Sequence, residues 1–247
     1  MKLLVAAALI LASGAAGAAE RAYAVMSLIG DGVMLVQHRP TAGSSLSDRT
    51  RQFVPFDERI FDRGALRAMQ AGIHHADPDA KVILLAGRDA QALAAEKDGL
   101  GQPTLAQSVA DALRGRLPQV GATHLVLLLK ARDAAPLPRT GGNVDAGELE
   151  GIGFYVDPTL VTRLDEASPA ALGYFAPYAY FTLALVDLAT GKVVAQKRVH
   201  AANPYEAARS NALRPWDSLG PDEKVRALQA LLDDQAESAA TALVGSR

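Results

Sequence analysis

The stretch THLVLLLKA, residues 123–131, decides the fold of this chain. Its central side chains are apolar at every position, so an extended chain here would have two apolar faces. Such a strand is stable when layers of the protein cover both faces. The sequence therefore predicts that residues 123–131 form a central strand of a covered sheet.

Helical patterns lie on both sides of this strand. Apolar residues recur at helical spacing after Asp62, an expected N-cap, up to about His75. Residues 89–97 form a second predicted helix, and Thr104 with Gln107 predicts a capping box for a third, which ends near Leu117. Residues 82–86 are predicted as a short buried strand.

The last helix is the longest one predicted, at about 22 residues from Pro221 onward. One stripe should pack on the sheet, and the acidic residues should face water. The stripe comprises Val225, Leu228, Leu232, Ala239 and Leu243, and the acidic residues are Asp233, Asp234 and Glu237.

Two hairpins and one long loop complete the expected elements. Residues 22–28 and 33–38 are apolar runs joined by Ile29-Gly-Asp-Gly32, which predicts an opening hairpin. Residues 178–188 and 193–200 flank Ala189-Thr-Gly-Lys192, which predicts a second one. The prolines and paired glycines of residues 134–151 predict a loop.

The order of these elements gives the fold class α/β (α+β): one domain, a mixed β-sheet with hairpins, covered by amphipathic helices. Regular alternation of strand and helix, as in a doubly wound parallel sheet, is missing. No shift in composition divides the chain, so residues 19–247 are expected to form the single domain.

Residues 1–18 have the pattern of a secretory signal peptide. Lys2 precedes an apolar run, and Ala16-Gly-Ala18 fits a cleavage site after Ala18 or Ala19. We therefore expect an exported protein of the periplasm with no transmembrane segment after cleavage. The sequence contains no cysteine, which excludes disulfides, thiolate chemistry and lipid attachment through cysteine. With 25 basic and 27 acidic residues, the composition does not favour nucleic-acid binding.

No motif assigns catalytic, cofactor-binding or metal-binding residues, and no cofactor is expected. The nucleophile elbow, the phosphate-binding loop and the dinucleotide fingerprint are all missing. His74 and His75 are adjacent on a helix and diverge by about 100°, so they cannot bind one ion together. His38, His124 and His200 remain as candidates for a metal-assisted hydrolase, provided that they converge.

Aromatic residues are concentrated in residues 174–181. This stretch holds five of the twelve phenylalanines and tyrosines of the chain. The cluster fits either packing within the sheet or a contact surface for a partner, because aromatic residues are favoured at interfaces. The candidate partner surface comprises Tyr174, Tyr178 and Tyr180.

The run FTLALVDLATGKVV, residues 181–194, is a hairpin with a D-x-x-T-G-K turn. Together with the helix before residue 124 and the closing helix, it resembles an exported α/β domain. That domain is shared by curli-secretion proteins, penicillin-binding-protein activator lipoproteins and the N-terminal domain of the Tol-system propeller protein. The resemblance covers residues 104–243 and implies binding and assembly work at the envelope without catalysis.

These observations lead to one hypothesis and two alternatives. The hypothesis is a non-catalytic periplasmic binding or envelope-assembly accessory module whose partner is an envelope protein. The alternatives are a metal-assisted periplasmic hydrolase and a small-ligand-binding protein.

Overall fold

The computed structural model describes residues 21–30, 32–39, 48–56, 59–86, 90–113, 121–162, 171–206 and 215–246. Four α-helices are described: α1 (Ile60–Ala76), α2 (Ala90–Gly99), α3 (Leu105–Leu113) and α4 (Pro221–Gly245). A short 3-10 helix, η3, spans Pro215–Ser218. The predicted signal peptide, residues 1–18, lies outside the described residues.

The described strands form a mixed sheet, as the sequence predicts. They are β1 (Ala22–Ser27), β2 (Gly32–Arg39), β3 (Asp48–Pro55), β4 (Lys81–Leu85), β5 (His124–Lys130), β6 (Arg132–Arg139), β7 (Gly142–Thr162), β8 (Ala171–Asp187), β9 (Lys192–Ala202) and β10 (Tyr205–Glu206). The path across the sheet runs β3-β2-β7-β8-β5-β1-β4.

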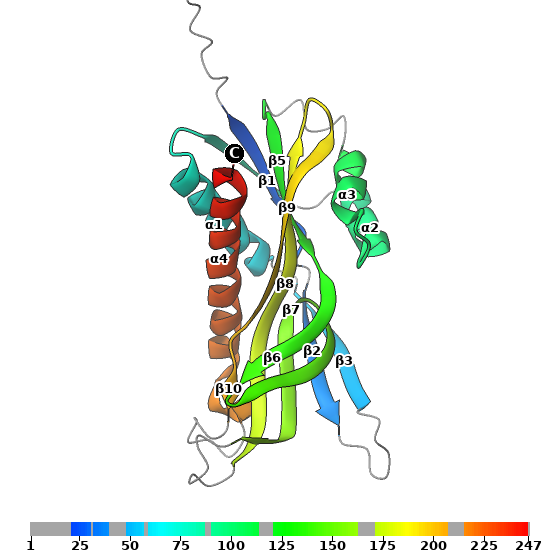
Figure 1. The fold of residues 1–247 in the computed structure, drawn as a ribbon, viewed down its shortest axis with the longest axis vertical. Helices are drawn as coiled ribbons and strands as arrows, with labels where there is room; N and C mark the ends of the chain where they lie inside the picture. The colour runs from blue at the N-terminus through cyan, green and yellow to red at the C-terminus, as the bar shows by residue number, and fades with distance from the viewer. Residues whose placement is uncertain are drawn as a thin grey trace, which may run out of the picture.

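Strand β8 joins two halves of this sheet. Along one edge it pairs with β9 and then β10. Along the other edge, residues 181–187 pair with β5, whereas residues 171–180 pair mainly with β7. One half of the sheet therefore holds β5, β1 and β4, and the other half holds β7, β2 and β3 (Figure 1).

The prediction of a central strand at residues 123–131 is confirmed. Strand β5 lies between β1, to which it is parallel, and β8, to which it is antiparallel. Leu125 to Leu129 are all fully buried. Helices cover both faces of this region: α1 and α4 lie on one side of the sheet, and α2 and α3 on the other (Figure 1).

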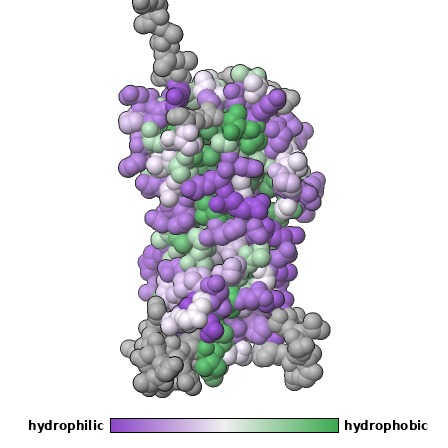
Figure 2. Space-filling view, in the orientation of Figure 1, coloured by the Kyte–Doolittle hydropathy of each residue, from purple (hydrophilic) through white to green (hydrophobic). Residues whose placement is uncertain are grey.

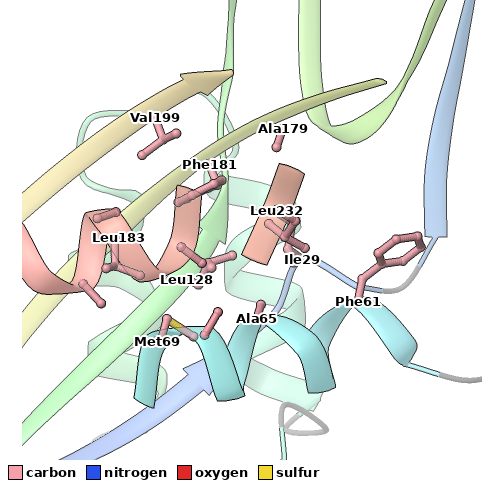
Figure 3. Packing of buried hydrophobic residues seen from close by; sticks show 14 of the residues in the cluster. Ile29, Phe61, Ala65, Met69, Leu128, Ala179, Phe181, Leu183, Val199 and Leu232 are labelled. Carbon is pink, nitrogen blue, oxygen red and sulfur yellow. The ribbon is translucent and has the colours of Figure 1, made fainter. Parts of the chain in front are cut away.

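The largest core lies between the sheet and the pair α1 and α4. Phe61, Met69 and Leu232 of the helices meet Leu128, Phe181 and Leu183 of the sheet (Figure 3). The two helices approach closely at Gly72, where a Cβ atom would collide with the backbone carbonyl of Glu237. Glycine at this position therefore allows the two helices to pack against each other.

The other face of the sheet has two separate covers. Helices α2 and α3 bury one core over β1, β5 and the start of the β8–β9 turn. The β6–β7 hairpin folds over the other half and buries a second core, which contains Leu137, Val144 and Leu149 of the hairpin. The β6–β7 hairpin thus replaces a helix as the covering layer on this half.

The predicted opening hairpin is wrong, although both of its strands exist. Strand β1 pairs in parallel with β4 and β5, while β2 pairs with β3 and β7. Leu28 and Ile29 are fully buried, and the Gly30 amide donates to the carboxylate of Asp62 at 3.0 Å. This buried carboxylate on α1 fixes the residues just before Asp31, where the chain leaves one half of the sheet for the other. A two-residue turn would instead have paired β2 with β1.

The predicted loop at residues 134–151 is also wrong, because it forms most of the β6–β7 hairpin. Pro136 and Pro138 are tolerated because β6 is paired on one side only, and the register shifts between Ala134 and Pro136. Gly141 and Gly142 adopt positive φ angles and make the turn.

Three smaller expectations also change. Helix α1 begins at Ile60, so Asp62 lies in its first turn and is not the N-cap. The strand at residues 82–86 is β4, which is partly exposed because, among the described strands, β1 alone pairs with it. Gln107 bonds to Gly191 and Val193 of the β8–β9 turn through its side chain, so it does not complete a capping box.

Helix α4 has the predicted buried stripe. Leu228, Leu232, Ala239 and Leu243 are buried, Val225 is half-buried, and Asp234 and Glu237 are exposed. Asp233 differs from the prediction, because it is half-buried beside Gly64 of α1. Within the described parts of the chain, no helix combines the length and apolar character needed to cross a membrane.

Candidate functional site

A cleft opens between the two covers on one face of the sheet. One wall is the connection from α2 into α3, with Gly101, Gln102 and Pro103 followed by the first residues of α3. The other wall is the bend at Ala131, where β5 continues into β6. Thr182 of β8 and Gln196 and Arg198 of β9 also line the cleft, whose volume is about 220 Å³. Hydrophilic residues gather across the middle of the face shown in Figure 2.

The charged residues in the described lining of the cleft are all basic. They are Lys130, Arg132 and Arg198, and the remaining polar lining consists of Gln102, Thr182 and Gln196. Among the described residues of the lining there is no aspartate or glutamate. The first turn of α3 also meets the cleft with Leu105 and Ala106, and a helix begins with a partial positive charge.

Carboxylates outside the lining orient both arginines. Arg132 donates from Nε and Nη2 to one oxygen of Glu150, at 3.0 and 2.6 Å. Arg198 donates from Nη1 to Asp133 at 2.9 Å. A backbone hydrogen bond from Ala134 lowers the pKa of Asp133, and Arg198 and His200 lower it further, so this carboxylate stays ionised at neutral pH.

Lys130 is held through its backbone. Its amide donates to Oε1 of Glu96, a buried side chain of α2, at 2.9 Å. Its ammonium lies 5.9 Å from the centre of the Phe53 ring, a cation–π contact with strand β3. The lysine thus contacts helix α2 through its backbone and strand β3 through its side chain.

The three candidate histidines do not converge. His200 lies opposite Tyr180 and His124 opposite Asp187, positions about 23 Å apart along β8 at roughly 3.3 Å per residue. His38 lies in β2, opposite Arg49 of β3. His200 contacts Asp133 at 3.3 Å and packs on Tyr180 with ring centres 4.7 Å apart. Among the described residues, no group of three His, Asp or Glu side chains fits a metal ion.

The three tyrosines of the candidate partner surface are core residues. Tyr174, Tyr178 and Tyr180 are 1%, 0% and 3% exposed, and they lie beneath the β6–β7 hairpin. Tyr174 donates to the carbonyl of Pro138, and burial raises the pKa of Tyr180 to about 12. Burial also raises the pKa of Tyr174 and Tyr178. Their rings pack the sheet against its cover and are not available on the outer surface.

The cleft residues were not singled out in the sequence. Lys130 and Arg132 lie at the end of the central strand, where an apolar run turns charged, and this change is the only local indication. Arg198 belongs to β9, and the α2–α3 connection lies far from both in the chain. The pairing of β8 with β5 and β9 brings the strand residues of the cleft together, and the packing of α2 and α3 on the sheet adds the α2–α3 connection.

No family model and no curated protein matches this chain. The solved structures that match include three that align with most of the chain. The first is a Xanthomonas campestris protein of family DUF330, with 11% identity, a TM-score of 0.31 and coverage of 92% of this chain and 82% of that one. The second is a hypothetical protein from Chlamydia trachomatis, with 14% identity, a TM-score of 0.34 and coverage of 91% and 99%.

The third structure is the PelC dodecamer from Paraburkholderia phytofirmans. It has 11% identity and a TM-score of 0.24, with coverage of 92% of this chain and 85% of that one. TM-scores this low establish no relationship between these proteins and this chain. None of the three is described as a curli-secretion protein, a penicillin-binding-protein activator or a Tol-system protein, so the resemblance noted in the sequence is not confirmed.

Proposed function

We propose that this chain is an exported, non-catalytic binding module of the bacterial periplasm, with an accessory role at the cell envelope. The observation that carries the proposal is the cleft between the two covers, which is lined by oriented polar and cationic side chains. A concave site with a few convergent polar groups is the usual form of a binding site. The export pattern of residues 1–18 supports the periplasmic location.

An envelope protein is the partner expected from the sequence, and the cleft is the place where we expect contact. A photo-crosslinking amino acid introduced at Gln102, which is exposed in the wall of the cleft, tests this. The matched control carries the same group at Ala230, which is exposed on α4. In living cells we expect a crosslinked adduct from position 102 and none from position 230. Equal crosslinking at both positions, or none at position 102, would contradict the proposal.

The same cells test whether the protein is located in the periplasm. Osmotic shock should release the full chain with the periplasmic fraction, whereas a chain that lacks residues 2–18 should remain in the cytosol. Retention of the full chain in the cytosol would contradict an exported role.

A small-ligand-binding protein is the second candidate function, and the volume of the cleft favours it. At about 220 Å³ the cleft is smaller than the roughly 300–1,000 Å³ of most ligand pockets, so it suits a compact group. Mass spectrometry of the protein purified from periplasm under native conditions separates the two candidates. A defined small molecule that co-purifies, with no crosslinked protein, would favour this second function.

A further inference from the structure

We propose that the cleft binds a phosphate group, carried either by a small soluble molecule or by a lipid headgroup. This inference rests on the proposed function in taking the cleft as the binding site, and it adds the chemistry of the ligand. The described lining of the cleft includes the basic residues Lys130, Arg132 and Arg198 and no acidic one. The ammonium of Lys130 lies over the Phe53 ring, so the two arginines supply the cationic groups of the cleft.

The two guanidinium groups keep donors available after binding their carboxylates. Arg132 uses Nε and Nη2 for Glu150, and Arg198 uses Nη1 for Asp133. A guanidinium has five N–H donors, so Nη1 of Arg132 and Nε and Nη2 of Arg198 remain for another acceptor. Both side chains are 47% exposed, so solvent and a ligand can reach them. The carboxylates limit the rotamers of the arginines, which lowers the entropy lost when a ligand binds.

The arrangement of donors favours a tetrahedral oxyanion over a planar one. Cations come from two separate elements, the β5–β6 bend and β9, while Gln102 comes from the opposite wall and Thr182 from β8. Donors that approach from several directions suit phosphate, whose oxygens point to the corners of a tetrahedron. A carboxylate accepts mainly in its own plane, as in its bidentate pairs with arginine.

The size of the cleft limits what enters it. A volume of about 220 Å³ holds one compact group and excludes most of a larger molecule. The rest of such a molecule would extend from the mouth of the cleft. A free phosphomonoester and a phospholipid headgroup both satisfy this condition, so the experiment includes both.

Isothermal titration calorimetry at low ionic strength tests the inference, with inorganic phosphate and glycerol 3-phosphate as probes and acetate as the planar control. Arg198→Gln and Arg132→Gln each remove one lining cation. Lys197→Gln removes the same charge from the neighbouring position of β9, where alternation along the strand turns the side chain to the other face. We expect phosphate affinity to fall about tenfold or more in both arginine variants and to stay unchanged in Lys197→Gln. Acetate should bind more weakly than phosphate to the wild type and to every variant.

Folding of each variant is checked by its melting temperature, which should change little because both arginines are half-exposed. Phosphate binding that is absent in the wild type, or equal in the arginine variants and the wild type, would overturn the inference. Co-flotation of the wild type, but not of Arg198→Gln, with vesicles of phosphatidylglycerol would identify the headgroup as the source. Binding of glycerol 3-phosphate without flotation would identify a soluble ligand.

The proposed function and the phosphate ligand are tested separately. Crosslinking from position 102 without any phosphate binding would retain the cleft as a binding site and reject phosphate as its ligand. Phosphate binding without crosslinking would support the ligand and move the proposed function from a protein partner to a small molecule.

Discussion

Asp62 is the side chain that connects the crossing after β1 to helix α1. Its carboxylate is buried and accepts hydrogen bonds from Ser27 Oγ at 2.6 Å and from the Gly30 amide at 3.0 Å. Asp62→Ala leaves both donors without this acceptor, so we expect a loss of about 2–4 kcal/mol in the free energy of unfolding. Urea denaturation measures it. Ser27→Ala, which removes one donor and keeps the carboxylate, should cost clearly less; an equal cost would show that the carboxylate contributes nothing beyond that one bond.

Asp233 should make stability depend on pH. Burial between α4 and α1 raises the pKa of its carboxyl, against opposing contributions from Gln229 and Arg67. A raised pKa in the folded state means that the ionised form is penalised, so stability falls as the pH rises through that pKa. Asp233→Asn keeps an oxygen for Gln229 and removes the charge. We expect a slightly higher melting temperature for the variant at pH 7 and no difference near pH 3; a variant less stable than wild type at pH 7 would contradict this.

Two side chains show where a local sequence pattern does not predict the structure. Asp62 and Gln107 occupy positions typical of helix caps, and both side chains instead bind distant backbone. A capping pattern describes only the preference of a local segment. In the folded protein these two side chains bind residues that lie 35 and 84 positions away along the chain. Nothing in the neighbouring sequence indicates such distant partners.

At the scale of elements, apolar periodicity identified most strands and helices but not the pairing of strands. The segments of β1, β2, β5, β8, β9 and α4 were all expected. The Asp-Gly pair after β1 predicted a hairpin, whereas the sheet pairs β1 with two parallel neighbours. The β6–β7 hairpin was missed because its prolines argue against a strand, although an edge strand tolerates them. The cleft depends on the bend into the β6–β7 hairpin and on the pairing of β8 with β5 and β9, so local patterns in the sequence could not predict it.

Helix α4 is the element whose contribution to stability is simplest to measure. Leu232 is fully buried in the core shared with α1 and the sheet, whereas Asp234 is exposed on the same helix. We expect Leu232→Ala to lower the free energy of unfolding by about 2–5 kcal/mol, because it removes buried apolar surface and leaves a cavity. Asp234→Ala should change it by less than about 0.5 kcal/mol. Thermal and urea melts give both values, and a Leu232→Ala variant as stable as wild type would mean that α4 does not complete this core.

At the scale of the whole molecule, β8 determines whether the chain unfolds as one unit. Its residues pair with β5 in one half of the sheet and with β7 in the other, and the core beneath α1 and α4 contains residues from both halves. Trp216 contacts Phe154 and Phe175 in the second half and Lys224 of α4, so its fluorescence reports on the place where α4 meets that half. Far-UV circular dichroism reports on all helices and strands. If residues 19–247 form one domain, the two signals should give coincident urea transitions in the wild type. They should also coincide in Leu137→Ala, which removes a side chain from the core beneath the β6–β7 hairpin. A tryptophan transition that precedes the loss of secondary structure would show that the half containing β7 unfolds separately, and the cleft would then lie between two units that can move independently.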